Sequence, residues 1–102
     1  MRIPITNPKE LGLVVRATRK TQNLRLDDAA AFANVGPVFA MDVEYGKPTV
    51  QFGRVLRLLE QLGLKLTVDV PDGVMPTLEA LRARGLRQRK TRAKALGGAG
   101  QP

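Results

Sequence analysis

The sequence predicts a mainly α-helical fold, with one compact domain followed by an appendage. Of its 102 residues, 43% are hydrophobic but only 4% are aromatic, so Leu, Val, Ala and Met must supply most of the core. That composition suits a helical bundle better than a sandwich of aromatic-rich strands. Apolar residues recur at helical spacing over residues 11–18 and 50–62, and only residues 64–70 alternate at the period of a strand.

The first predicted helix runs from about Pro8 to Thr21. Asn7 is suited to cap it, Pro8 fits the first turn, and Glu10 follows the cap by three residues. An apolar stripe along this helix is then expected from Leu11, Val14, Val15 and Thr18.

Two short helices are predicted next, joined by a three-residue turn. The first covers residues 27–33 and begins with two Asp residues, which favour the positive end of a helix. Asn34, Val35 and Gly36 form the turn, because Asn and Gly tolerate turn dihedrals. The second begins at Pro37, continues to Glu44 and is stopped by Gly46.

A fourth helix and a single strand complete the predicted domain. Thr49 is expected to cap the helix, which runs to Leu62 and is closed by Gly63. Residues 64–70 then alternate between apolar and polar, as in a β-strand. A lone strand needs a ladder partner, either residues 2–5 or the same strand of a second copy. We interpret it as a dimerisation strand whose apolar side chains are Leu64, Leu66, Val68 and Val70.

The net charge of +8 is concentrated at the C-terminus. Residues 1–75, the predicted domain, carry ten basic and eight acidic side chains, whereas residues 76–102 carry seven basic and one acidic. We expect residues 76–102 to be a flexible basic tail that is solvated, grips DNA through counterion release, or folds on a protein partner. The anchors for such folding would be Leu78, Leu81 and Leu86; RNA binding is not favoured, because the tail has no aromatic residue for stacking.

The residues that the chain lacks argue against an enzyme. It has neither Cys nor His, which removes disulfides, the usual zinc sites, thiol nucleophiles and imidazole bases, and we expect no metal or cofactor. Acidic pairs such as Asp27–Asp28 and Asp42–Glu44 lack a pocket-forming context. No run of about 18 apolar residues or signal pattern is present, so we expect a cytoplasmic protein without membrane contact.

Residues 26–46 have the pattern of a helix-turn-helix, followed by a longer packing helix. Residues 8–70 resemble the Xre/Cro-type, lambda-repressor-like domain of Hip-type (HipB-like) antitoxins, most specifically from Glu44 to Gln51 and in the LxxLGL sequence at residues 59–64. The resemblance implies a homodimer that represses its own operator in double-stranded DNA. It also implies a HipA-like serine/threonine kinase toxin as partner.

The resemblance further implies roles for individual residues. Arg19 on the first helix would pair with Glu44 at the end of the third and hold the fold together. The positions that would face base edges are Gly36, Pro37, Val38, Met41 and Asp42. They include no donor side chain; Pro37 and Val38 can contact a thymine methyl, and Asp42 can at most accept from cytosine.

Phosphate contacts are expected beside the recognition helix. The candidates are Lys47, Thr49, Gln51 and Arg54, with Arg16, Lys20 and Arg25 flanking them. Two other functions remain open. The domain can be a protein-docking subunit with weakened DNA specificity, since residues 37, 38 and 41 form an apolar patch, or a standalone phage-type regulator.

Overall fold

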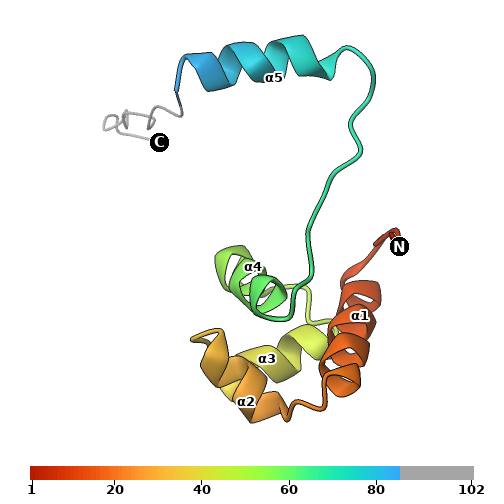
Figure 1. The fold of residues 1–102 in the computed structure, drawn as a ribbon, viewed down its shortest axis with the longest axis vertical. Coiled ribbons are helices and arrows are strands. Elements are labelled where there is room, and N and C mark those ends of the chain that lie inside the picture. Colours follow the sequence, from red (N-terminus) through yellow and green to blue (C-terminus); the bar gives the residue numbers. More distant parts are fainter. Residues whose placement is uncertain (86–102) are drawn as a thin grey trace. The chain divides into compact units, whose positions relative to one another are not determined.

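The computed structural model describes residues 1–85 of the chain, and these residues form five helices (Figure 1). The helices are α1 (Pro8–Thr21), α2 (Leu26–Phe32), α3 (Pro37–Glu44), α4 (Phe52–Gln61) and α5 (Val74–Ala83). The first four belong to one unit, Met1–Thr67, and a second unit begins at Val68. The mainly helical prediction is therefore confirmed.

Helix α1 begins and ends where the sequence predicts. The Asn7 side chain accepts a hydrogen bond of 2.9 Å from the backbone N–H of Glu10, and Pro8 occupies the first helical position. After Thr21 the chain reverses through Asn23, whose φ of 59° lies in the left-handed region that Asn tolerates better than most residues.

The predicted helix-turn-helix is formed by α2 and α3. Asn34 has a φ of 58° and turns the chain after α2, and the N–H of Val35 donates to Ala30 O at 2.9 Å. Gly36 does not supply the turn, contrary to our expectation, because its φ is an ordinary −73° and it stands at the N-cap position of α3. The unusual backbone geometry is therefore carried by Asn34 alone.

The core lies between α1, α2, α3 and α4. Small alanines let α2 and α3 approach closely, while α4 contributes the larger side chains. The buried residues are Val15, Ala29, Ala30, Ala33, Ala40, Val43, Val55, Leu58, Leu59 and Leu62. This core holds the helix-turn-helix in place and leaves one side of α3 exposed to solvent.

Helix α4 begins two residues later than predicted. Thr49 does not cap it; the N-cap position belongs to Gln51, which makes no side-chain capping bond. Val50 is partly buried against the core. This contact keeps the loop before α4 from continuing the helix toward Thr49. The helix ends at Gln61, and Gly63 follows with a φ of 79°.

The predicted strand over residues 64–70 is not formed within the single chain, and residues 1–85 contain no strand at all. Leu64 packs partly against the core, but Lys65 to Val70 are all exposed. A strand requires hydrogen bonds to a neighbour, and neither residues 2–5 nor any other part of the described chain provides one.

Helix α5 occupies part of the predicted tail. It begins at Val74, because Gly73 with a φ of 93° turns the chain immediately ahead of it, so residues 76–83 are helical where a flexible segment was expected. None of its residues is buried. The rest of the expected tail, including the proposed anchor Leu86, lies outside the described residues.

Candidate nucleic-acid interface

The recognition helix α3 is fixed to α1 by an ion pair between Arg19 and Glu44. Arg19 Nε donates to Glu44 Oε2 at 2.6 Å and Arg19 Nη2 donates to Glu44 Oε1 at 3.0 Å, a bidentate geometry. Arg19 Nη1 also donates to Leu24 O at 2.9 Å, in the connection between α1 and α2. Glu44 is only 5% exposed, and the one guanidinium of Arg19 links α1, the α1–α2 connection and α3.

The environment of Arg19 favours its charged form. The hydrogen bond that Arg19 donates to Glu44, together with that carboxylate's charge, raises the pKa of Arg19, while burial opposes the shift. An arginine is charged at all physiological pH values, so the guanidinium of Arg19 remains a cation. Both charges are already hydrogen-bonded and are unavailable for direct contact with a ligand.

A close approach of backbones also ties α1 to α3. A Cβ added at Gly12 would lie 2.5 Å from Glu44 O and 2.6 Å from Val43 O, distances that real Cβ atoms do not adopt. Gly12 was not among the residues predicted from the sequence to be important. Its position inside a predicted helix could have indicated a close contact, because a glycine there costs stability and usually has a packing reason.

The side of α3 that faces away from the core is apolar. Gly36 and Pro37 are exposed, Val38 is 65% exposed and Met41 is 40% exposed. Tyr45, which follows α3 directly, is 67% exposed. The structure thus places the predicted base-facing residues together on one solvent-exposed side of α3.

Asp42 is the predicted base-facing residue that carries a charge, and it has a partner. Its Oδ2 lies 3.6 Å from Lys47 Nζ, and the N–H of Lys47 donates to Asp42 O at 2.9 Å. Asp42 is half-buried and Lys47 is exposed. The lysine therefore lies at the edge of α3, where it offsets the negative charge that Asp42 would otherwise present.

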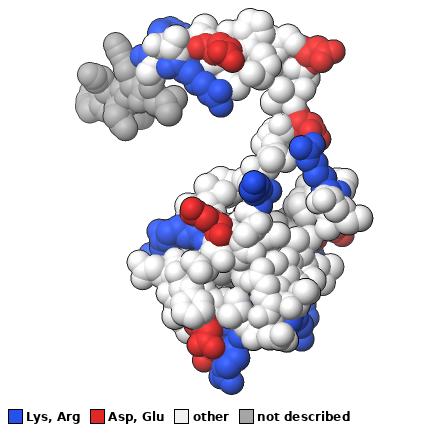
Figure 2. All heavy atoms as spheres, in the orientation of Figure 1, with Lys and Arg blue, Asp and Glu red and all other residues white. Residues whose placement is uncertain are grey.

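The start of α4 provides the remaining predicted contacts. Thr49, Gln51 and Arg54 are all exposed, and the first N–H groups of α4 receive no side-chain cap. Such groups and the positive end of the helix dipole favour an anion. In Figure 2, the Lys and Arg atoms of the helical unit lie at separate points of the visible face, with uncharged atoms between them.

Two of the expected flanking cations are engaged elsewhere. Arg25 pairs with Asp27 at 3.2 Å, which raises the pKa of Arg25 and lowers that of Asp27. The Arg16 guanidinium lies 5.1 Å from the centre of the Tyr45 ring, within cation–π distance. Lys20 is exposed. Arg16 therefore supports the Tyr45 end of the α3 surface, a role that the sequence did not reveal.

Two polar side chains cap helices across the unit and were also overlooked. Arg57 of α4 donates to the carbonyls of Ala33 and Asn34 at the end of α2, at 3.3 and 3.0 Å. Gln22 donates to Leu62 O at 2.9 Å, at the end of α4. Such long-range capping has no local sequence pattern, so it could be found only from the fold.

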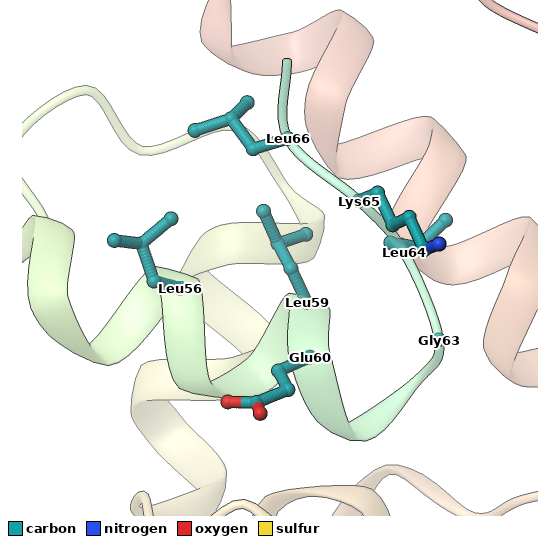
Figure 3. Close-up of a pocket in the computed structure, with 7 residues that line it drawn as sticks. All are labelled: Leu56, Leu59, Glu60, Gly63, Leu64, Lys65 and Leu66. Carbon is teal, nitrogen blue, oxygen red and sulfur yellow. The ribbon is translucent and has the colours of Figure 1, made fainter.

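A separate apolar pocket of about 340 Å³ lies at the C-terminal end of α4. It is lined by Leu56, Leu59, Glu60, Gly63, Leu64, Lys65 and Leu66. Figure 3 shows Leu59 and Leu66 approaching each other beside Leu56, while the Glu60 carboxylate points away from them. Two of the predicted dimerisation residues, Leu64 and Leu66, thus share one hollow with α4.

Other kinds of site have no support in the described chain. Residues 1–85 contain no group of three or more His, Cys, Asp or Glu side chains arranged to hold a metal ion. Among the same residues, no helix is long and apolar enough to cross a bilayer. The side of α3 and the start of α4 therefore remain the principal candidate interface.

Sequence comparison gives this helical arrangement a family. No family model matches the chain. It is, however, 46% identical over 67 residues, 66% of this chain and 88% of the relative, to an uncharacterized HTH-type transcriptional regulator, y4mF, from Sinorhizobium fredii. With an α2–α3 helix-turn-helix in the structure and this degree of identity, the chain belongs to the HTH-type transcriptional regulators.

Proposed function

We propose that this protein is a dimeric repressor that binds operator DNA in its own promoter. The observation that carries the proposal is the exposed apolar side of α3, which is followed in the chain by the exposed Lys47 and by the uncapped start of α4. α3 would enter the major groove, and Lys47, Thr49, Gln51 and Arg54 would contact the flanking phosphates. Membership of the HTH-type transcriptional regulators supports this assignment.

Fluorescence anisotropy tests the DNA-binding part of the proposal. We expect the purified protein to bind the DNA upstream of its own gene more tightly than scrambled DNA of the same length and composition. Affinity should fall with salt, because bound phosphates release counterions. If the two DNAs bound equally at every salt concentration, operator recognition would be ruled out.

Arg54→Gln tests the phosphate-binding edge. Arg54 is exposed, and the structure gives it no ion pair within residues 1–85, so the substitution should leave the fold intact. The slope of log affinity against log salt should decrease by about 1. Lys65→Gln is the matched control, because it removes the same charge at an exposed position on the pocket side. An unchanged slope for Arg54→Gln would place the interface elsewhere.

For the dimer, we propose that residues 64–70 pair with the same residues of a second copy. The segment lacks hydrogen-bonding partners in the single chain, and Leu66, Val68 and Val70 are exposed. Pairing would satisfy the backbone, and the leucines around the pocket would gain cover.

Light scattering of a double variant tests this interface. Leu66→Glu with Val68→Glu should halve the mass, because the charges would fall on the apolar side of the strand. Thr67→Glu is the control, since alternate residues of a strand point to opposite faces. A dimeric double variant would show that the interface lies elsewhere.

The resemblance to Hip-type antitoxins extends the proposal to a HipA-like kinase toxin as partner. The residues that support it are Glu44 to Gln51 and the LxxLGL sequence at residues 59–64. Co-expression with a kinase-like protein encoded next to this gene should yield a complex on size exclusion and relieve toxicity. Absence of any such neighbouring gene would favour the standalone phage-type regulator.

The exposed apolar side of α3 also favours a second function. Val38 and Met41 would suit a protein surface, so the domain can act as a docking subunit with weak DNA specificity. In that case Val38→Glu would abolish binding of the protein partner, while the affinity for the upstream DNA would match that for scrambled DNA. Under the repressor proposal, the same substitution mainly weakens operator binding.

A further inference from the structure

We propose that α3 recognises DNA through the C5-methyl groups of pyrimidines, with Val38 and Met41 as the residues that determine specificity. Thymine presents such a methyl in the major groove, and 5-methylcytosine presents the same group. The inference rests on the proposed DNA binding and states what chemical feature of the operator is read.

The exposed side of α3 is a stripe of apolar side chains. Val38, Met41 and Tyr45 are spaced by three and four residues, so they lie on one side of the helix. Each is at least 40% exposed. A Cβ added at Gly36 would meet nothing within 4 Å, so the start of α3 is unobstructed and can come close to a base edge.

The composition of α3 itself leaves it no unpartnered side chain that can hydrogen-bond a base. The helix has the sequence PVFAMDVE, which contains no side-chain hydrogen-bond donor. Its two polar residues are acceptors that already have partners, Asp42 with Lys47 and Glu44 with Arg19. Pro37, at the first position, has no backbone N–H. Among the sequence-dependent features of the major groove, the exposed α3 side chains Val38 and Met41 can contact only a methyl group.

The surroundings of the stripe favour DNA over a protein as its occupant. Lys47 lies beside α3 through its ion pair with Asp42, and the start of α4, where Thr49 and Arg54 are exposed, follows shortly after in the chain. Cations and free N–H groups beside an apolar stripe match phosphates that flank methyl-bearing bases. Affinity would come from the phosphates, and the choice of sequence from the methyl groups.

The experiment removes the methyl groups from the DNA without changing its base pairing. The upstream fragment is amplified with dTTP, with dUTP in place of dTTP, or with 5-methyl-dCTP in place of dCTP, and the Kd of the wild-type protein is measured by anisotropy. Burying one methyl group is worth roughly a fourfold change in affinity, so the uracil fragment should bind at least about fourfold more weakly. If the methyl group that α3 reads belongs to 5-methylcytosine, the affinity should instead increase for the fragment made with 5-methyl-dCTP.

Variants identify which side chains make the contact. Val38→Ala and Met41→Ala together should bind the thymine and uracil fragments with equal affinity, because the groups that sense the methyl are gone. Both residues are exposed, so these variants should fold normally. Arg54→Gln is the matched control: it should weaken binding to both fragments by the same factor and keep the wild-type ratio, since it acts on phosphates.

The outcomes separate this inference from the proposed function. If the protein prefers its own fragment to scrambled DNA but does not respond to any change in methylation, methyl reading is overturned and the repressor assignment stands. If no form of the fragment is preferred to scrambled DNA, both are overturned, and the α3 stripe becomes a protein-binding surface.

Discussion

Helices α4 and α5 are each ten residues long and each begins without a side-chain cap, yet they differ in what holds them. α4 buries Val55, Leu58 and Leu59 in the core of the helical unit. α5 buries nothing, although Val74, Leu78 and Leu81 follow helical spacing. An isolated helix of this length is only marginally stable in water. The two helices therefore differ in stability because of their packing and not because of their apolar content. The same contrast between buried and exposed groups should decide the effect of each substitution.

The largest effect is expected from Glu44→Ala, which breaks the ion pair at the centre of the helical unit. It would leave Arg19 charged and largely buried without its carboxylate partner. Removing one member of such a pair typically costs about 3–5 kcal/mol of unfolding free energy. Urea denaturation at fixed protein concentration, followed by circular dichroism, measures the loss.

A double substitution provides the control for Glu44→Ala. Arg19→Met with Glu44→Leu removes both charges and replaces them with apolar groups of similar size, which is often nearly neutral. The double variant should therefore be more stable than Glu44→Ala alone. Equal losses would mean that packing around Glu44, and not its charge, stabilises the contact between α1 and α3.

Leu58→Ala and Leu81→Ala compare α4 and α5 directly. Leu58 is fully buried, so its truncation should cost about 2–5 kcal/mol through lost contacts and a cavity. Leu81 is 48% exposed, and its truncation should change the unfolding free energy by less than about 0.5 kcal/mol. A clear loss for Leu81→Ala that grows with protein concentration would show that α5 packs against a second copy in solution.

Most of the helical unit was predictable because its signals are local. Asn7, Pro8 and Glu10 specify the start of α1, and the Asn34 turn separates the two helices of the motif. The Arg19–Glu44 pair lay beyond this local reasoning, and only the resemblance to a known domain indicated it. The sequence around Arg19 and the sequence around Glu44 do not indicate that these two side chains are in contact.

Several errors share a physical cause, which is that the deciding contact lies far away in the sequence or is missing from the single chain. The start of α4 shifted because Val50 packs against the core. The strand at residues 64–70 alternates correctly but has no ladder partner in one chain. Gly12 and Arg57 act on backbone atoms more than twenty residues away, so a local pattern does not identify their contacts.

A smaller effect is expected from Gly12→Ala, which tests the approach of α1 to α3. The new methyl would overlap the carbonyl oxygens of Val43 and Glu44, and overpacking of this kind typically costs about 1–3 kcal/mol. Gly53→Ala is the control, because its Cβ would meet nothing within 4 Å and alanine favours a helix by up to about 1 kcal/mol. Thermal denaturation should therefore move the two variants in opposite directions.

The smallest effect is expected from Asp27→Asn, although Asp27 belongs to the same unit as Glu44. Its ion pair with Arg25 is exposed, so water and salt screen the attraction. Because that pair lowers the pKa of Asp27 in the folded state, its contribution is present above the usual Asp range and is lost as pH falls through the lowered pKa. The difference in stability between the wild type and Asp27→Asn should thus be small at neutral pH and vanish in acid. Thermal denaturation across a pH series measures it. If Asp27→Asn lost as much stability at neutral pH as Glu44→Ala, the strength of an ion pair in this unit would depend on its position and not on its burial.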